Sequence, residues 1–308
     1  MIDVIQGDCR EWLSFFPPNH FQTCVTSPPY YGLRDYGVDG QIGLEATPDA
    51  YVARLVDVFR EVRRVLRDDG TLWLNLGDSY ARAGGTDRQI SSTGKVGNTL
   101  KTLEMLPCRK QAPPDGLKDK DLLGIPWLVA FALRADGWWL RQDIIWHKPN
   151  PMPESVKDRC TKAHEYIFLL SKSEKYYFDY AAMRETAVYP AGTKGAKGSA
   201  KRQAEKGVNA RPAEYKVYDG FRNRRSVWTV TTKPFNGAHF ATFPPDLIEP
   251  CVLAGSRPGD LVLDPFGGAG TTALVARNHN RRAVLIELNP AYVEIAEKRV
   301  GLAGAVVA

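Results

Sequence analysis

The chain has 308 residues, of which 44% are hydrophobic and 25% are charged, a balance typical of a globular protein with a large core. No stretch approaches the roughly 18 consecutive apolar residues that a membrane helix needs. Residues 1–5 carry neither the charged nor the apolar part of a secretory signal. The five cysteines are scattered and form no CxxC pair, which argues against a disulfide framework or a zinc site. We therefore expect a cytoplasmic protein with no membrane partner.

The net charge of +6 is concentrated in one segment. Residues 194–225 contain ten lysines or arginines and three acids, so they carry +7 and the other 276 residues sum to −1. A second irregular stretch, residues 80–120, has eight basic and four acidic residues. Such a basic segment favours a polyanionic partner, although a charged run can also be no more than a solvated loop.

In chain order, the first elements alternate between strand and helix. Strands are predicted at residues 3–6, 21–26 and 71–76. Between the last two, Thr47 and Pro48 predict a helix start, and apolar residues then recur at helical spacing as far as Val65. This succession indicates a parallel α/β sheet.

The pattern is interrupted by residues 80–120 and resumes afterwards. The later elements are a helix at 122–135, strands at 139–146 and 165–171, a helix at 246–253, a strand at 261–264, a helix at 271–278, a strand at 282–286 and a final helix from Pro290. We predict one catalytic α/β domain over residues 1–308, a mostly parallel sheet with helices on both faces. Residues 80–120 and 186–226 are predicted to be insertions.

A glycine-rich turn follows the strand at 261–264. Gly267, Gly268 and Gly270 allow a ligand to approach the backbone, and the helix that begins at Thr271 offers free N–H groups. Glu287 ends the next strand, where an acid can hold both ribose hydroxyls. A purely structural turn is the alternative. The spacing differs from GxGxxG, so S-adenosylmethionine is favoured over a dinucleotide.

Two prolines follow the strand at 21–26, in the sequence Ser27-Pro28-Pro29-Tyr30, where the chain must leave the sheet. Alone, this sequence could be a stiffened turn. An exocyclic amino group of a base is a poor nucleophile, and acceptors for its N–H groups can make it tetrahedral. The Ser27 hydroxyl and Pro28 carbonyl suit that task, and Tyr30 suits stacking on a base rotated out of the duplex.

Together, TSPPY and DPFGGAGTT resemble the catalytic and cofactor motifs of the DNA amino-methyltransferases, the bacterial and phage N4-cytosine/N6-adenine family. The catalytic motif comes first, as in the family's β group. The resemblance implies a Rossmann-like methyltransferase fold with a seven-stranded sheet in circularly permuted order, and S-adenosyl-L-methionine as cofactor. The implied cofactor residues are Asp8, Cys9, Phe240, Ala241, Thr242, Asp264, Phe266, Gly267, Gly268, Gly270, Thr271 and Glu287.

Cysteine and histidine residues offer little support for other chemistry. Cytosine-C5 methylation uses a Pro-Cys nucleophile, but Cys108 and Cys251 lie outside a suitable setting, and we interpret both as structural. The histidines show no metal-ligand spacing, so no metal is implied. His147 and Lys148 lie in a segment that resembles the border of the target-base pocket.

The expected partner is double-stranded DNA, with a homodimer as a further possibility from the resemblance and any restriction endonuclease partner left open. The residues predicted to contact DNA are Lys148, Lys194, Lys197, Lys201, Arg202, Arg222, Arg224 and Arg225. Ser27 resembles cytosine-N4 enzymes, whereas the run of residues 26–37 followed by 41–45 resembles members assigned to adenine. Adenine N6 is narrowly favoured. Cytosine N4, RNA amino methylation and non-catalytic DNA binding are the alternatives.

Overall fold

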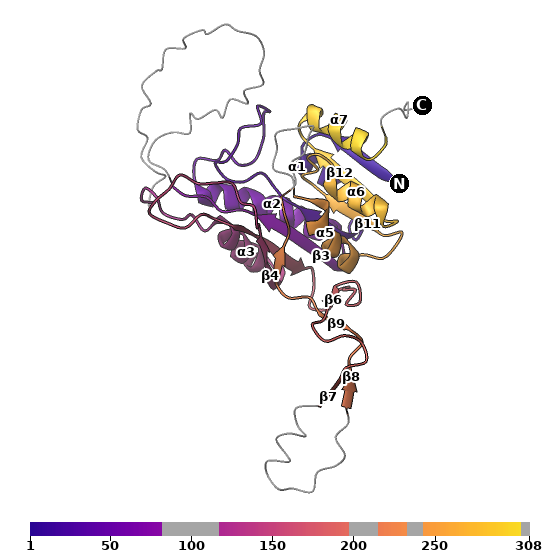
Figure 1. Ribbon diagram of the computed structural model, residues 1–308. Helices are drawn as coiled ribbons and strands as arrows, with labels where there is room; N and C mark the ends of the chain where they lie inside the picture. Colours follow the sequence, from indigo (N-terminus) through magenta and orange to yellow (C-terminus); the bar gives the residue numbers. More distant parts are fainter. Residues whose placement is uncertain (82–116, 197–214, 233–242, 303–308) are drawn as a thin grey trace, which may run out of the picture. The chain divides into compact units, whose positions relative to one another are not determined.

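The computed structural model describes residues 1–81, 117–196, 215–232 and 243–302 (Figure 1). Two compact units result, one made of Met1–Phe178 with Ser226–Ala308 and the other of Asp179–Arg225. The sites predicted at Phe240, Ala241, Thr242, Lys197, Lys201 and Arg202, and Cys108, lie outside the described residues.

The larger unit is built on one sheet with the strand order β1-β12-β11-β2-β3-β5-β4-β10. The strands are β1 (Ile2–Gln6), β2 (Phe21–Thr26), β3 (Leu66–Leu76), β4 (Trp139–His147), β5 (His164–Ser171), β10 (Val227–Thr229), β11 (Leu261–Asp264) and β12 (Arg282–Glu287). Among these described strands, only β5 runs antiparallel to its neighbours, β3 and β4. The mostly parallel sheet is therefore confirmed, and the three-residue β10, which pairs with β4, adds an eighth strand that was not predicted.

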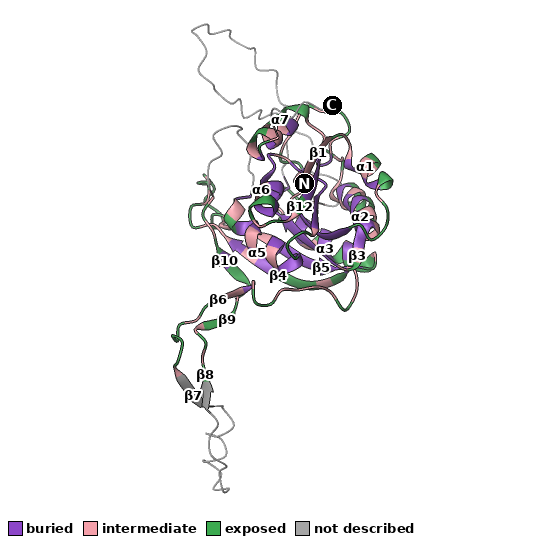
Figure 2. Ribbon diagram, turned by 90° about the vertical axis from the view of Figure 1, so that its right-hand side faces the viewer, coloured by how far each residue is buried: buried purple, intermediate pink, exposed green. Residues whose placement is uncertain are grey.

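Helices cover both faces of this sheet (Figure 2). One face carries α1 (Cys9–Phe15), α2 (Pro48–Val65) and α3 (Ile125–Ala135), and the other carries α5 (Pro245–Gly255), α6 (Thr271–Asn278) and α7 (Pro290–Arg299). Because both faces are covered, the central strand β2 is buried along its whole length. This accounts for the absence of a regular alternation between polar and apolar residues in that strand.

Helix α2 shows how local sequence positions these elements. The hydroxyl of Thr47 accepts a hydrogen bond from the amide of Ala50 at 3.2 Å, and Pro48 occupies the first turn, as predicted. Its buried face, which includes Tyr51, Leu55 and Val62, packs into the core cluster. The next strand starts at Leu66, five residues before the predicted start, because the chain enters the sheet directly after the helix.

Two further predictions differ from the structure. The helix predicted from residue 122 begins at Ile125, because Gly124 precedes it in a left-handed conformation (φ +72°). Helix α1 was not predicted at all, since seven residues are too few to show a clear period. Cys251 is fully buried in α5, which confirms its structural interpretation.

The described residues of the smaller unit form two antiparallel ladders. Strand β6 (Arg184–Thr186) pairs with β9 (Phe221–Asn223), and β7 (Lys194–Ala196) pairs with β8 (Tyr215–Val217). Sequence patterns predicted no strands here, because three residues show no periodicity. In neither unit is a described helix both long and apolar enough to cross a membrane.

Candidate active site

A cavity opens in the larger unit at the carboxyl ends of β1, β12, β11 and β2. Ligands of open α/β sheets bind at this edge, because the loops that follow the strands converge there. The lining comes from residues 7–9, 27–30, 264–269 and 286–289, together with a loop that contributes residues between 33 and 42. The catalytic and cofactor motifs, more than 230 residues apart in the chain, therefore share one cavity.

Most of the described residues predicted for the site line this cavity. They are Asp8, Cys9, Ser27, Pro28, Pro29, Tyr30, Asp264, Phe266, Gly267, Gly268, Thr271 and Glu287. Gly270 instead caps the start of α6. Sequence reasoning missed several apolar and aromatic wall residues, namely Tyr36, Val38, Ile42, Leu288 and Tyr292. Phe243 also lines the cavity, and it belongs to the segment 239–244 that resembles the cofactor-wrapping segment of the family. The proximity of Leu288 to Glu287 was the only available signal for Leu288.

The glycine turn is shaped by close backbone packing. The amide of Gly267 donates to the carbonyl of Ile286 at 2.8 Å, which joins the turn to β12. A methyl group on Gly267 would lie 2.9 Å from the Cβ of Leu285, so no larger residue fits. Gly268 and Gly270 have φ values of +48° and +77°, which glycine adopts without strain. The turn therefore needs glycine for its backbone conformation and for close packing against β12, and Gly267 and Gly268 line the cavity.

Glu287 ends β12 with its carboxylate against this turn. One oxygen accepts the amide of Gly268 at 2.7 Å, and the other accepts the amide of Asn289 at 2.8 Å. Burial raises the pKa of this carboxyl above its ordinary value, against the lowering effect of these two bonds. Each oxygen keeps a lone pair, so the fixed carboxylate suits a pair of ribose hydroxyls.

Asp8 and Cys9 form another part of the wall. The carboxylate of Asp8 caps α1 by accepting the amide of Arg10 at 2.8 Å, and it also forms an ion pair with that side chain. Burial opposes ionisation of Asp8, but the bonds and charge of Arg10 prevail and lower its pKa. Burial raises the pKa of the Cys9 thiol to about 12, so this side chain is a neutral, apolar surface.

Asp264 lines the base of the cavity, and its carboxylate is fully engaged by neighbouring residues. Its buried carboxylate accepts the hydroxyls of Thr26 and Thr272, each at 2.6 Å, and the amide of Phe266 at 3.1 Å. Burial raises its pKa to about 6, although these bonds lower it. We infer that Asp264 holds β2, β11 and α6 together beneath the cavity and acts on a ligand only through that geometry.

The prolines present Ser27 at the cavity. Pro28 is buried and Ser27 is half-buried. The hydroxyl of Tyr51 on α2 donates to the Pro29 carbonyl at 2.8 Å, which fixes the peptide that follows Pro29. Proline rings set the backbone angle and Tyr51 holds the loop, so the Ser27 hydroxyl and the Pro28 carbonyl are held in a rigid segment.

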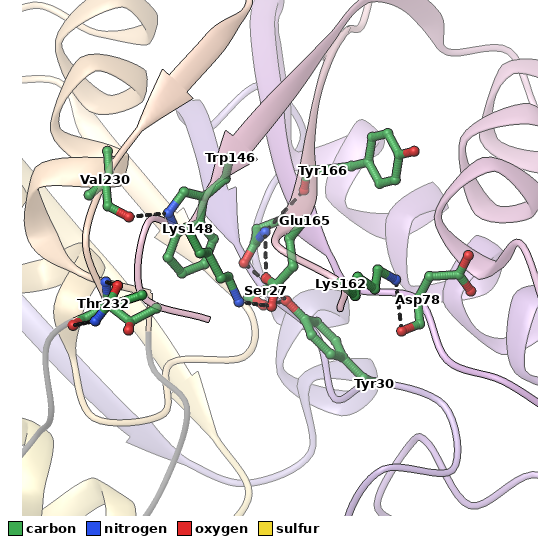
Figure 3. Close-up of polar contacts among 12 residues, drawn as sticks. Ser27, Tyr30, Asp78, Trp146, Lys148, Lys162, Glu165, Tyr166, Val230 and Thr232 are labelled. Atoms are coloured by element: carbon green, nitrogen blue, oxygen red, sulfur yellow. Dashed lines mark hydrogen bonds and ion pairs between the residues drawn. The ribbon is translucent and has the colours of Figure 1, made fainter. Parts of the chain in front are cut away.

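Tyr30 belongs to a polar network beside this loop (Figure 3). Its hydroxyl lies 2.7 Å from Glu165 Oε2, 3.1 Å from Asn75 Oδ1 and 3.5 Å from Ser27 Oγ. The other oxygen of Glu165 pairs with Lys148, whose ammonium lies 4.2 Å from the centre of the Trp146 ring. Burial, and next the charge of Glu165, raise the pKa of Tyr30 well above its ordinary value. Glu165 and Asn75 were not predicted from sequence.

The residues predicted to contact DNA are divided between the two units. Lys148 lies in the network just described, with its side chain 18% exposed. In the smaller unit, Arg222 and Arg225 both pair with Glu185, at 2.9 and 3.1 Å. Arg224 follows β9, and Lys194 begins β7. Contact with DNA remains a prediction for all of them.

Comparison with known proteins identifies the family to which this chain belongs. The model of a DNA methylase family matches residues 21–298. M.Cfr9I, a type II methyltransferase of Citrobacter freundii, is 49% identical over 296 residues, which cover 96% of this chain and 86% of the relative. The chain belongs to this N6/N4 DNA methylase family. The methylase modifies an exocyclic amino nitrogen of DNA, with adenine N6 and cytosine N4 both allowed, and uses S-adenosylmethionine.

Solved structures share the fold of the methylase. The cytosine-N4-specific PvuII DNA methyltransferase is similar with a TM-score of 0.63 and 21% identity, over 98% of this chain and 87% of that one. A putative DNA modification methylase from Thermus thermophilus, solved in complex with S-adenosyl-L-methionine, has a TM-score of 0.59 and 24% identity, over 98% and 94%. The fold predicted from the motif order is thus confirmed.

The residues present fit this cofactor. Gly267 packs its backbone against Leu285 and lines the cavity together with Gly268. The Glu287 carboxylate is held by two backbone amides and has acceptor capacity to spare. Apolar and aromatic residues complete the wall near Glu287, among them Leu288 and Tyr292. Such a combination suits an adenosine with free ribose hydroxyls and a positively charged sulfonium.

Proposed function

We propose that this methylase is a site-specific type II enzyme that methylates N4 of cytosine in duplex DNA. The observation that carries the proposal is the rigid Ser27-Pro28 segment at the edge of the cavity that Glu287 also lines. The Ser27 hydroxyl and the Pro28 carbonyl accept the two N–H groups of the target amine and turn its lone pair toward the methyl donor. Bound S-adenosylmethionine supplies a methyl group on a positively charged sulfur.

The reaction needs no covalent bond to the protein. The chain holds the base amine against Ser27. The amine nitrogen bonds to the methyl carbon as the carbon–sulfur bond of the donor breaks with inversion, and the nitrogen then loses one proton to water. The glycine turn and Glu287 hold the donor at the other end of the cavity. A paired base cannot reach such a pocket, so we propose that the target nucleotide rotates out of the duplex and stacks on Tyr30.

The choice of base rests on Ser27. A hydroxyl at this position resembles cytosine-N4 enzymes, whereas the resemblance to adenine enzymes came partly from residues 41–45. Gln41 accepts the amide of Tyr36 at 2.7 Å, and Glu45 accepts the amide of Gly43 at 2.8 Å. Residues 41–45 therefore shape the loop that walls the cavity, so this part of the resemblance is explained without reference to the base. Adenine N6 is the second candidate.

The test is methylation of unmethylated genomic DNA with radiolabelled S-adenosylmethionine, followed by digestion to nucleosides and mass spectrometry. We expect label on N4-methylcytosine, lost in a Ser27→Ala variant that still binds the cofactor. Label on N6-methyladenine would refute the base assignment and leave amino methylation standing. Label on RNA but not on DNA would overturn the proposed substrate.

A further inference from the structure

Serine at position 27 creates a problem of orientation. A carboxylate only accepts hydrogen bonds, but a hydroxyl also carries a proton that can point toward the target amine. In that orientation Ser27 would repel the N–H group that it is meant to bind. The surrounding residues must therefore direct the Ser27 proton away from the cavity.

We propose that Glu165 is a positioning residue that orients the Ser27 hydroxyl through Tyr30. The inference rests on the proposed amino methylation and adds a residue that neither the catalytic nor the cofactor motif contains. Glu165 is not among the residues that line the cavity, and its hydrogen bond to Tyr30 connects it with the catalytic loop.

The direction of the hydrogen bonds follows from counting protons. A phenol has one proton, and two acceptors compete for that of Tyr30: Glu165 Oε2 at 2.7 Å and Asn75 Oδ1 at 3.1 Å. The bond to an ionised carboxylate is the shorter and stronger of the two. The Tyr30 proton therefore points to Glu165 and away from Ser27, so the phenol oxygen presents a lone pair to Ser27.

Ser27 can then act only as a donor toward Tyr30. Its Oγ lies 3.5 Å from the phenol oxygen, a long contact in which the serine is the donor. With its proton directed there, the lone pairs of Ser27 are left for the target amine. Figure 3 shows the chain of contacts, with Tyr30 pointing at Glu165 and Lys148 on the opposite side of that carboxylate.

The neighbours of Glu165 hold it in this role. Lys148 pairs with Oε1 and keeps a positive charge beside the carboxylate. Asn75 donates its amide to the Tyr166 carbonyl at 3.0 Å and to Glu165 Oε2 at 3.3 Å, so its own oxygen faces Tyr30. The side chains of Lys148 and Glu165 are 18% and 16% exposed, which limits competition from water.

The experiment compares single-turnover methylation of genomic DNA by wild type, Glu165→Gln, Tyr30→Phe and the double variant. Phenylalanine keeps the ring and removes only the hydroxyl. We expect each single variant to lose roughly 10- to 100-fold in rate, by similar factors, with the affinity for S-adenosylmethionine unchanged. The double variant should be no slower than Tyr30→Phe, because both changes break one relay.

Several results would overturn this inference. They are a Glu165→Gln rate equal to wild type, a further loss in the double variant, or a Tyr30→Phe loss far beyond that of Glu165→Gln. Glu174→Gln, an exposed acid after β5, is the matched control and should keep full rate. Thermal melting of each variant separates unfolding from lost orientation. If wild type methylates no DNA, the proposed function fails and this inference fails with it.

Discussion

The hydroxyl of Thr26 donates a 2.6 Å hydrogen bond to the buried carboxylate of Asp264. Thr26 ends β2 immediately before Ser27, and Asp264 ends β11 immediately before the glycine turn. One bond between residues 238 positions apart in the chain therefore sets the catalytic loop against the cofactor turn. Methyl transfer requires these two loops to hold their distance, since small misplacements of reacting groups are costly.

An Asp264→Asn variant tests the buried carboxyl through pH. Its pKa is raised from 3.8 to about 6 in the folded protein, so the folded state keeps a proton that the unfolded chain has already lost. The stability from this proton is present below about pH 4 and is lost as pH rises through 6. The unfolding free energy of wild type relative to Asp264→Asn should thus fall by on the order of 1–3 kcal/mol between pH 4 and 7. Denaturant titrations at several pH values measure it, and a constant difference would contradict the assignment.

Glu287→Gln should weaken cofactor binding. The amide replaces one acceptor oxygen by a donor, which then faces the amide of Gly268 or Asn289 or a ribose hydroxyl. We expect the dissociation constant for S-adenosylmethionine to rise roughly 10- to 100-fold, from the loss of one charge-assisted hydrogen bond. Isothermal titration calorimetry measures this constant. Glu294→Gln, an exposed change on α7, serves as control, and equal affinities in both variants would refute the role of Glu287.

Gly77→Ala should disturb Tyr30 without touching the cofactor wall. The new methyl group would lie 2.5 Å from Cε2 of the Tyr30 ring, so the ring must leave the position in which its hydroxyl meets Glu165. We expect the methylation rate to fall roughly 10-fold or more while cofactor affinity stays within about twofold of wild type. Rate and calorimetric measurements on one preparation separate the two effects. An unchanged rate would show that the Tyr30 position tolerates this shift.

Charge in the smaller unit should appear in the salt dependence of DNA binding. Each phosphate contact contributes about 0.9 to the slope of log affinity against log salt concentration. If Arg222 and Arg225 both contact phosphates, their joint replacement by glutamine should lower that slope by up to about 2. Fluorescence anisotropy between roughly 50 and 200 mM salt measures it. Lys298→Gln, at the exposed end of α7, is the control, and matching slopes in all three proteins would exclude phosphate contact by the two arginines.

Sequence alone identified the elements whose patterns are strong. The strands at 21–26 and 261–264 and the helix at 271–278 have the predicted bounds. Proline or glycine residues next to these buried runs mark where each element begins or ends. The same local rules singled out Ser27, Gly267 and Glu287, which the structure brings to one cavity. Short elements such as α1 and β10 escaped prediction, since they contain too few residues for a period.

What only the tertiary structure decided is which distant polar groups meet. Glu165 and Asn75 lie in ordinary strand sequences, and nothing local marks them as partners of Tyr30. Their role arises because β5 returns antiparallel between β3 and β4, which brings the start of β5 beside the ends of β3 and β4. Strand order is set by packing of the whole sheet rather than by neighbours in sequence. The catalytic and cofactor motifs could therefore be identified from the sequence. The hydrogen-bond network of Tyr30, Glu165 and Asn75 could be identified only from the folded structure.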